Sequence, residues 1–260
     1  MTKPYSPIFL IFKSINQILL RLNTIFKIFL IIFFTNSLSS SQNIQSAGES
    51  GIPLITNYLP KNYYANMQNW ASLQDKRGVM YFANGEGVLE YDGVNWRLIN
   101  VPNDLVRCLA IDEDGIIYVG GINEIGYLSA DSTGLLKYAS LNKLISKDIP
   151  DFGDVWRIIV NQDGLYFQTF SSLFLIESSK EKNASFLNGV LKNHFIKRWE
   201  SRTRFNPIHS LENRIFAHER NVGLQELVDG KLNILKGGEE FAQDLICIML
   251  PYSSDKLLIG

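Results

Sequence analysis

The sequence predicts an all-β fold, a β-propeller built from four-stranded blades. One segment occurs several times: an apolar strand, a polar turn that ends in glycine, and a strand that carries an aromatic residue. Its copies recur at roughly 40- to 50-residue intervals, which is the spacing of propeller blades. Between the copies, the chain lacks the helical segments of about ten or more residues that a barrel or a doubly wound domain needs.

The first three copies are centred on the turn glycines Gly78, Gly115 and Gly164. Glycine adopts positive φ without a Cβ clash, so the polar residues before each glycine are predicted to close a short hairpin loop. The residues that follow, such as those at 116–119, are β-branched or aromatic, as is typical of strands.

Each copy also has a second half, which is another hairpin. In the first copy it covers 87–93 and in the fourth 223–230, and both end in Asp-Gly. Two hairpins for each copy predict four strands in each blade. The fourth copy has Asn213 where the turn glycine falls, and a fifth copy begins at Pro251. We therefore expect an incomplete propeller of about four blades plus the start of a fifth.

Residues 1–41 are predicted to be a signal peptide or an N-terminal membrane segment that precedes the propeller. The apolar run at 25–34 follows basic residues and precedes small polar ones, which is the layout of a signal peptide. It is shorter than the roughly 20 apolar residues of a spanning helix, so removal is favoured over anchoring. Residues 42–66 are predicted to be a linker and lead-in strand, and 67–260 a partial β-propeller domain that is truncated at its C-terminus.

Charge and motifs exclude several classes of function. The net charge is −1, but no acidic residue precedes Glu49, so the rest of the chain is mildly acidic. An acidic body argues against direct nucleic-acid binding. The sequence has no Cys or His spacing typical of a metal site, no nucleophile elbow and no phosphate-binding loop. We expect no catalytic residue, metal or cofactor. Cys108 and Cys247 fall in corresponding apolar strands and are predicted to be small core residues.

Four residues are candidates for a ligand site: Trp70, Arg107, Trp156 and Arg157. The first three stand at the same offset before the turn of their copy. If the copies superpose, these side chains lie at one level of successive strands, at one end of the ring. Aromatic faces and guanidinium groups that converge there can hold a sugar or an acidic ligand. The alternative is that the tryptophans fill space between adjacent blades.

The segments 52–63, 68–70, 75–82 and 87–96 together resemble the N-terminal sensor region of bacterial two-component-regulator propeller proteins, common in Bacteroidetes. The shared pattern is Asp-x-x-Gly-x-x-Tyr followed by Gly-x-x-x-Tyr/Phe-Asp-Gly. The resemblance is strong over residues 51–135 and weaker, repeat by repeat, to the end of the chain.

The resemblance implies an exported, periplasmic propeller that belongs to a membrane-tethered regulator. In that family a β-sandwich, a membrane helix and a cytoplasmic histidine kinase or helix-turn-helix domain follow the propeller. This chain has no motif of those parts, so it is similar to the front end of such a sensor. The implied function is ligand sensing in signal transduction and transcription regulation, without catalysis. The implied partners are a carbohydrate or other small ligand, the downstream output domain, and a second copy in a full-length homodimer.

Two other classes of function remain open at this stage. The first is a propeller platform for protein interaction, whose functional surface would lie on an outer edge. The second is a propeller-fold lyase or hydrolase, which needs clustered acids, bases or metal ligands at the ring opening. The first strands supply mainly Trp, Arg and aliphatic residues there, so the enzyme ranks last.

Overall fold

The computed structural model describes Lys27 and residues 55–145, 149, 151–178, 187–188, 196–253 and 256–260. The predicted signal segment at 1–41 lies outside the described residues, apart from Lys27. No helix within the described residues is long and apolar enough to cross a membrane. The chain from Asn57 to Gly260 forms one compact unit.

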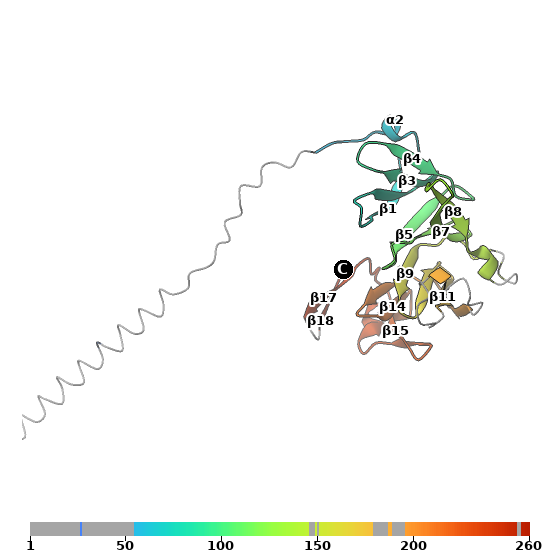
Figure 1. Cartoon of the computed structure of the whole chain (residues 1–260). Coiled ribbons are helices and arrows are strands. Elements are labelled where there is room, and N and C mark those ends of the chain that lie inside the picture. The colour runs from blue at the N-terminus through green and yellow to red at the C-terminus, as the bar shows by residue number, and fades with distance from the viewer. Residues whose placement is uncertain are drawn as a thin grey trace, which may run out of the picture. The chain divides into compact units, whose positions relative to one another are not determined.

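Four four-stranded antiparallel sheets follow one another along this unit, and each has its strands in sequence order (Figure 1). Blade 1 consists of β1 (Asn69–Gln74), β2 (Met80–Asn84), β3 (Gly87–Tyr91) and β4 (Trp96–Ile99). Blade 2 consists of β5 (Val106–Ile111), β6 (Ile117–Gly121), β7 (Glu124–Ala130) and β8 (Leu136–Ser140). Blade 3 consists of β9 (Arg157–Asn161), β10 (Gly164–Gln168), β11 (Ser172–Glu177) and β12 (Ile196–Glu200). Blade 4 consists of β13 (His209–Leu211), β14 (Arg214–Glu219), β15 (Gly223–Val228) and β16 (Lys231–Ile234).

A fifth, two-stranded sheet pairs β17 (Met249–Ser253) with β18 (Lys256–Ile259). Two short 3-10 helices, η1 (Asn142–Leu144) and η2 (Gly238–Phe241), follow blades 2 and 4. The predicted propeller of four blades and the start of a fifth is therefore confirmed. The expected lead-in strand is not found among residues 55–66, where the structure has the helix α2 (Pro60–Tyr63) instead. This helix places Tyr63 against Trp96, with ring centroids 5.3 Å apart.

The Asp-x-x-Gly-x-x-Tyr pattern is one hydrogen-bonded unit. In blade 2, Asp112 accepts the N–H of Ile116 at 2.8 Å and the hydroxyl of Tyr118 at 3.0 Å. Gly115 closes the loop at φ +87°, a conformation that favours glycine. Burial raises the pKa of Tyr118, and the charge of Asp112 adds to the shift. The carboxylate of Asp112 thus holds both the turn and the side chain of Tyr118 in place.

The corresponding turns of blades 3 and 4 differ from this unit. In blade 4, Glu212 and Asn213 both have positive φ, at 51° and 64°, as a two-residue type I′ hairpin requires. Asparagine therefore replaces the turn glycine as predicted. In blade 3, Gly164 begins β10, and a Cβ there would lie 2.2 Å from the carbonyl oxygen of Ile176. Glycine is therefore needed at position 164 both for the turn and for the close approach of β11 to β10.

Separate hydrophobic clusters lie between successive blades. Alternate residues of each strand point to opposite faces of its sheet, so each blade packs against the blade before it and the blade after it. The cluster between blades 2 and 3 is built around Phe167 and Phe174, whose rings stack with centroids 4.7 Å apart. First strands of neighbouring blades also contact each other, β1 with β5 and β5 with β9. The first strands are therefore innermost, and their starts define what we call the entry end.

Candidate functional site

Trp70 and Arg107 each occupy a β-bulge at the entry end. In β1, Asn69 pairs with Asn84 and Ala71 with Ala83, so Trp70 is the extra residue. In β5, the register shifts in the same way between Val106 and Cys108, which leaves Arg107 as the extra residue. A bulge bends the strand and redirects the side chain that it carries. Blades 1 and 2 thus both have a β-bulge near the start of their first strand.

Trp156 repeats this arrangement just before β9. Its backbone N–H donates to the backbone carbonyl of Gln168 at 2.8 Å, and Gln168 is also the cross-strand partner of Arg157. Trp70, Arg107 and Trp156 therefore lie at one level of three successive first strands, as their common offset from the turns predicts.

The three side chains touch one another. The guanidinium carbon of Arg107 lies 4.1 Å from the ring centroid of Trp70 and 4.4 Å from that of Trp156. The two indoles meet edge to face, at 5.9 Å and 84°. Asp154 accepts hydrogen bonds from Nε and Nη2 of Arg107, at 3.0 and 2.8 Å.

The contact chain continues beyond these residues. Trp156 stacks on Phe170 with centroids 4.8 Å apart, and the guanidinium of Arg204 lies 3.6 Å from the Phe170 ring. We call Trp70, Arg107, Trp156, Phe170 and Arg204 the cation–aromatic stack. Phe170, Arg204 and Asp154 could not be predicted as part of this site from the sequence, because they lie in connections that follow no repeat.

The stack both fills space between blades and exposes aromatic surface. The side chain of Arg107 is only 14% exposed and its charge is matched by Asp154, whereas Trp70 remains 38% exposed. The indole Nε1 of Trp156, a member of the stack, is buried and has no hydrogen-bond partner within the described part of the chain. An unpaired buried donor costs about 1–3 kcal/mol, so a ligand that accepts a hydrogen bond from this N–H would recover free energy.

Arg157 does not take part in this stack. It is exposed, and its charge acts instead on two buried groups, Cys108 and His209. Burial raises the pKa of the Cys108 thiol to about 12, although Arg157 opposes the shift. The thiol lies 3.2 Å from the carbonyl of Val155. The prediction that Cys108 is a core residue is confirmed, but the one for Cys247 is wrong, because Cys247 is exposed.

His209 gives the fold a pH dependence. Burial lowers its pKa to about 4, and the charge of Arg157 contributes to the same shift. Since an unfolded imidazole titrates near pH 6.5, the unfolded chain binds a proton that the folded chain resists. We expect this contribution to stability to be complete above about pH 6.5 and to be lost as the pH falls toward about 4.

Urea denaturation at about pH 7.5 and about pH 5 measures this effect. The His209→Gln variant should lose less stability between the two values than the wild-type chain does. Identical losses would show that carboxylates alone account for the acid sensitivity.

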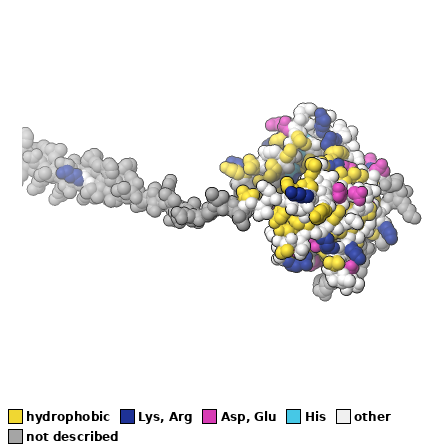
Figure 2. All heavy atoms as spheres, turned by 90° about the horizontal axis from the view of Figure 1, so that it is seen from above, with side chains coloured by type: hydrophobic (Ala, Val, Ile, Leu, Met, Phe, Trp, Pro, Cys, Tyr) yellow, Lys and Arg dark blue, Asp and Glu magenta, His cyan; other side chains and the backbone are white. Residues whose placement is uncertain are grey.

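Two adjoining cavities lie away from the stack, beside the first hairpin turns of blades 2 to 4. They measure about 420 and 500 Å³ and share Ser178 and Asn213. Among the residues that the structure describes, no group of three His, Cys, Asp or Glu side chains could hold a metal ion. Figure 2 shows one face of the molecule, where Lys and Arg lie among acidic and hydrophobic side chains.

No family model and no curated protein matches this chain. Two solved structures of an extracellular domain from B. thetaiotaomicron resemble it, one described as a putative hybrid two-component system and the other as a putative one-component system. Their TM-scores are 0.54 and 0.53 at 16% identity, and the matches cover 76% and 74% of this chain. The chain spans only 25% of the length of each.

A virginiamycin B lyase from Staphylococcus aureus matches less well, with a TM-score of 0.44 at 14% identity. That match covers 65% of this chain and 56% of the lyase. At these identities a similarity shows the fold alone. The resemblance stated from the sequence is therefore confirmed for the fold: the chain shares a propeller with extracellular domains of two-component-system proteins of Bacteroidetes.

Proposed function

We propose that this chain is the extracytoplasmic sensor propeller of a membrane-tethered regulator, and that it binds a ligand without catalysing a reaction. The fold supports this proposal, because two solved structures that resemble the chain with TM-scores above 0.5 are extracellular domains of a putative hybrid two-component system and a putative one-component system. The output, a histidine kinase or a helix-turn-helix domain, would act from another part of the full-length protein.

The cation–aromatic stack is the proposed ligand site. The observation that carries the proposal is the unpaired, buried Nε1 of Trp156, whose indole meets the still exposed indole of Trp70 with ring centroids 5.9 Å apart. A sugar ring, or another small ligand with a flat apolar face and hydroxyl groups, matches this arrangement. Its face would lie on Trp70, and one of its hydroxyl oxygens would accept from the indole N–H of Trp156.

Replacing Trp70 by Ala tests this site. We expect the ligand response of the full-length regulator to fall at least about tenfold, because the indole supplies the exposed stacking surface. The free energy of unfolding should fall by only about 1 kcal/mol, since Trp70 contacts Arg107 at a partly exposed position. Calorimetric titration of the full chain with mono- and disaccharides, together with a transcript reporter in cells, measures the response.

Tyr64→Ala is the matched control, because Tyr64 is an exposed aromatic residue outside the stack. It should leave the response unchanged. If Trp70→Ala unfolds the chain without a selective loss of response, the tryptophans serve packing only and the ligand site is refuted.

A further inference from the structure

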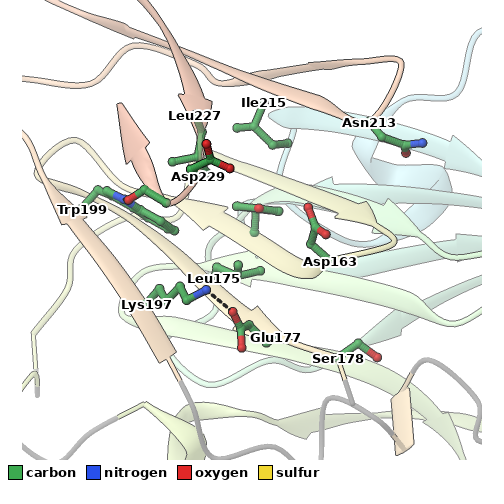
Figure 3. A pocket seen from close by; sticks show the side chains of 12 residues that line it. Asp163, Leu175, Glu177, Ser178, Lys197, Trp199, Asn213, Ile215, Leu227 and Asp229 are labelled. Atoms are coloured by element: carbon green, nitrogen blue, oxygen red, sulfur yellow. Dashed lines mark hydrogen bonds and ion pairs between the residues drawn. The ribbon is translucent and has the colours of Figure 1, made fainter. Parts of the chain in front are cut away.

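The smaller of these two cavities lies between blades 3 and 4 (Figure 3). It is lined by Asp163, which follows β9, and by Glu177, which ends β11, whereas the stack lies at the starts of the first strands. Its volume of about 420 Å³ falls in the range of small-molecule sites, about 300–1,000 Å³. Strands β10, β11 and β12 form one wall, and strands β14 and β15 form the other.

Strand periodicity explains why a cavity forms here. Leu173, Leu175 and Glu177 alternate along β11 and therefore share one face of the sheet. Leu173 and Leu175 belong to the cluster between blades 3 and 4. Glu177 ends the strand and forms an ion pair with Lys197 of β12. Apolar packing between the blades thus stops at Leu175, and charged residues line the space beyond it.

Trp199 provides a fixed aromatic wall. Its Nε1 donates to the carbonyl of Gly230 at 2.8 Å, which ties the indole of blade 3 to the β15–β16 turn of blade 4. Leu175 of the blade 3 wall and Leu227 of the blade 4 wall supply apolar surface beside it. A fixed indole beside the apolar side chains of the two walls favours a ligand with an aliphatic stem.

The charge of the lining selects the sign of the ligand. Asp163, Glu177 and Asp229 face a single base, Lys197, so the lining has a net negative charge. Asp163 and Asp229 are exposed. In Figure 3, Asp229 lies nearer to Trp199 than Asp163 does.

From this geometry we propose that the cavity binds an organic cation, an ammonium or guanidinium group on an aliphatic stem. The stem lies on Leu175 and Leu227, and the cationic group lies against Asp229 and the indole of Trp199, where carboxylate attraction and the cation–π contact act together. Such a cation is supplied either by a free alkyl diamine or by a lysine or arginine side chain of a peptide.

Calorimetric titration of the full chain with cadaverine and with Nα-acetyl-lysine methylamide tests the proposal. We expect saturable binding of at least one of these amines, and no binding of pentanol, which keeps the stem without the charge. Asp229→Asn should weaken amine binding about fivefold, and Asp163→Asn/Asp229→Asn still further. Glu240→Gln is the matched control, because it removes one exposed charge outside the cavity and should change nothing.

Stronger binding of the lysine derivative would assign the site to a peptide side chain, and stronger binding of cadaverine to a free diamine. Absence of binding by both amines would overturn the proposal, as would equal affinities of the wild-type chain and Asp229→Asn. The sensor proposal is tested separately, because Trp70→Ala alters the entry end and should leave amine binding intact.

Discussion

Phe167→Ala should lower the free energy of unfolding by about 3–5 kcal/mol. Phe167 is fully buried in β10 at the centre of blade 3. Its ring stacks on Phe174 at 4.7 Å and meets Phe152 edge to face at 6.0 Å. The substitution removes apolar burial and leaves a cavity that the two flanking strands cannot close. Urea denaturation of the full chain, followed by circular dichroism, measures the loss.

Leu135→Ala provides the control for this variant. Leu135 is an exposed apolar side chain in the turn before β8, and its removal should change stability by no more than about 0.5 kcal/mol. Comparable losses in the two variants would mean that the cluster between blades 2 and 3 does not dominate the stability of the fold.

Glu219→Ala should cost about 3 kcal/mol or more. The carboxylate of Glu219 is buried and accepts hydrogen bonds from Ser201 Oγ, from the N–H groups of Arg202 and Thr203, and from Gln225 Nε2. It thus holds the connection from blade 3 to blade 4. Alanine removes this acceptor from all four donors, of which the Thr203 N–H also donates to Ser201 Oγ at 3.1 Å. A buried donor left unpaired is more costly than an absent interaction.

Glu219→Gln separates charge from shape. The amide keeps the volume and one acceptor, but it places an NH₂ group among donors, so we expect a smaller loss of about 1–2 kcal/mol. Glu200→Ala removes an exposed carboxylate paired with Arg198 and should cost less than about 1 kcal/mol. Thermal unfolding of the three variants ranks them. A loss for Glu200→Ala as large as that for Glu219→Ala would contradict the assigned role.

Much of this fold can be predicted from the sequence because its signals are local. The turn of Asp112 to Gly115 depends on hydrogen bonds within a few residues, and the alternating strands depend on a period of two. Trp70, Arg107 and Trp156 could be placed at one level because their offset from those turns is constant. The bulges beneath Trp70 and Arg107 could not be predicted, since an extra residue becomes visible only against its partner strand.

The missed features all depend on contacts between segments that are distant in sequence. Asp154 pairs with Arg107 and Phe170 joins the stack, both from connections without a repeat. Trp199 lines the cavity because β12 faces blade 4. The indole N–H of Trp199 donates to the carbonyl of Gly230, which lies 31 residues further along the chain. Cys247 lies just before the fifth sheet and is exposed, which the apolar pattern around it does not indicate.

The division of the core into separate clusters, one for each pair of adjacent sheets, has an evolutionary consequence. Each interface has to be complementary only to its immediate neighbour, because stability in such arrays is close to a sum of nearest-neighbour terms. A mutation in one interface can therefore be compensated within that interface alone. Duplicated units are then free to diverge in side chains while they keep a common backbone, which accounts for copies that share turns but few identical residues.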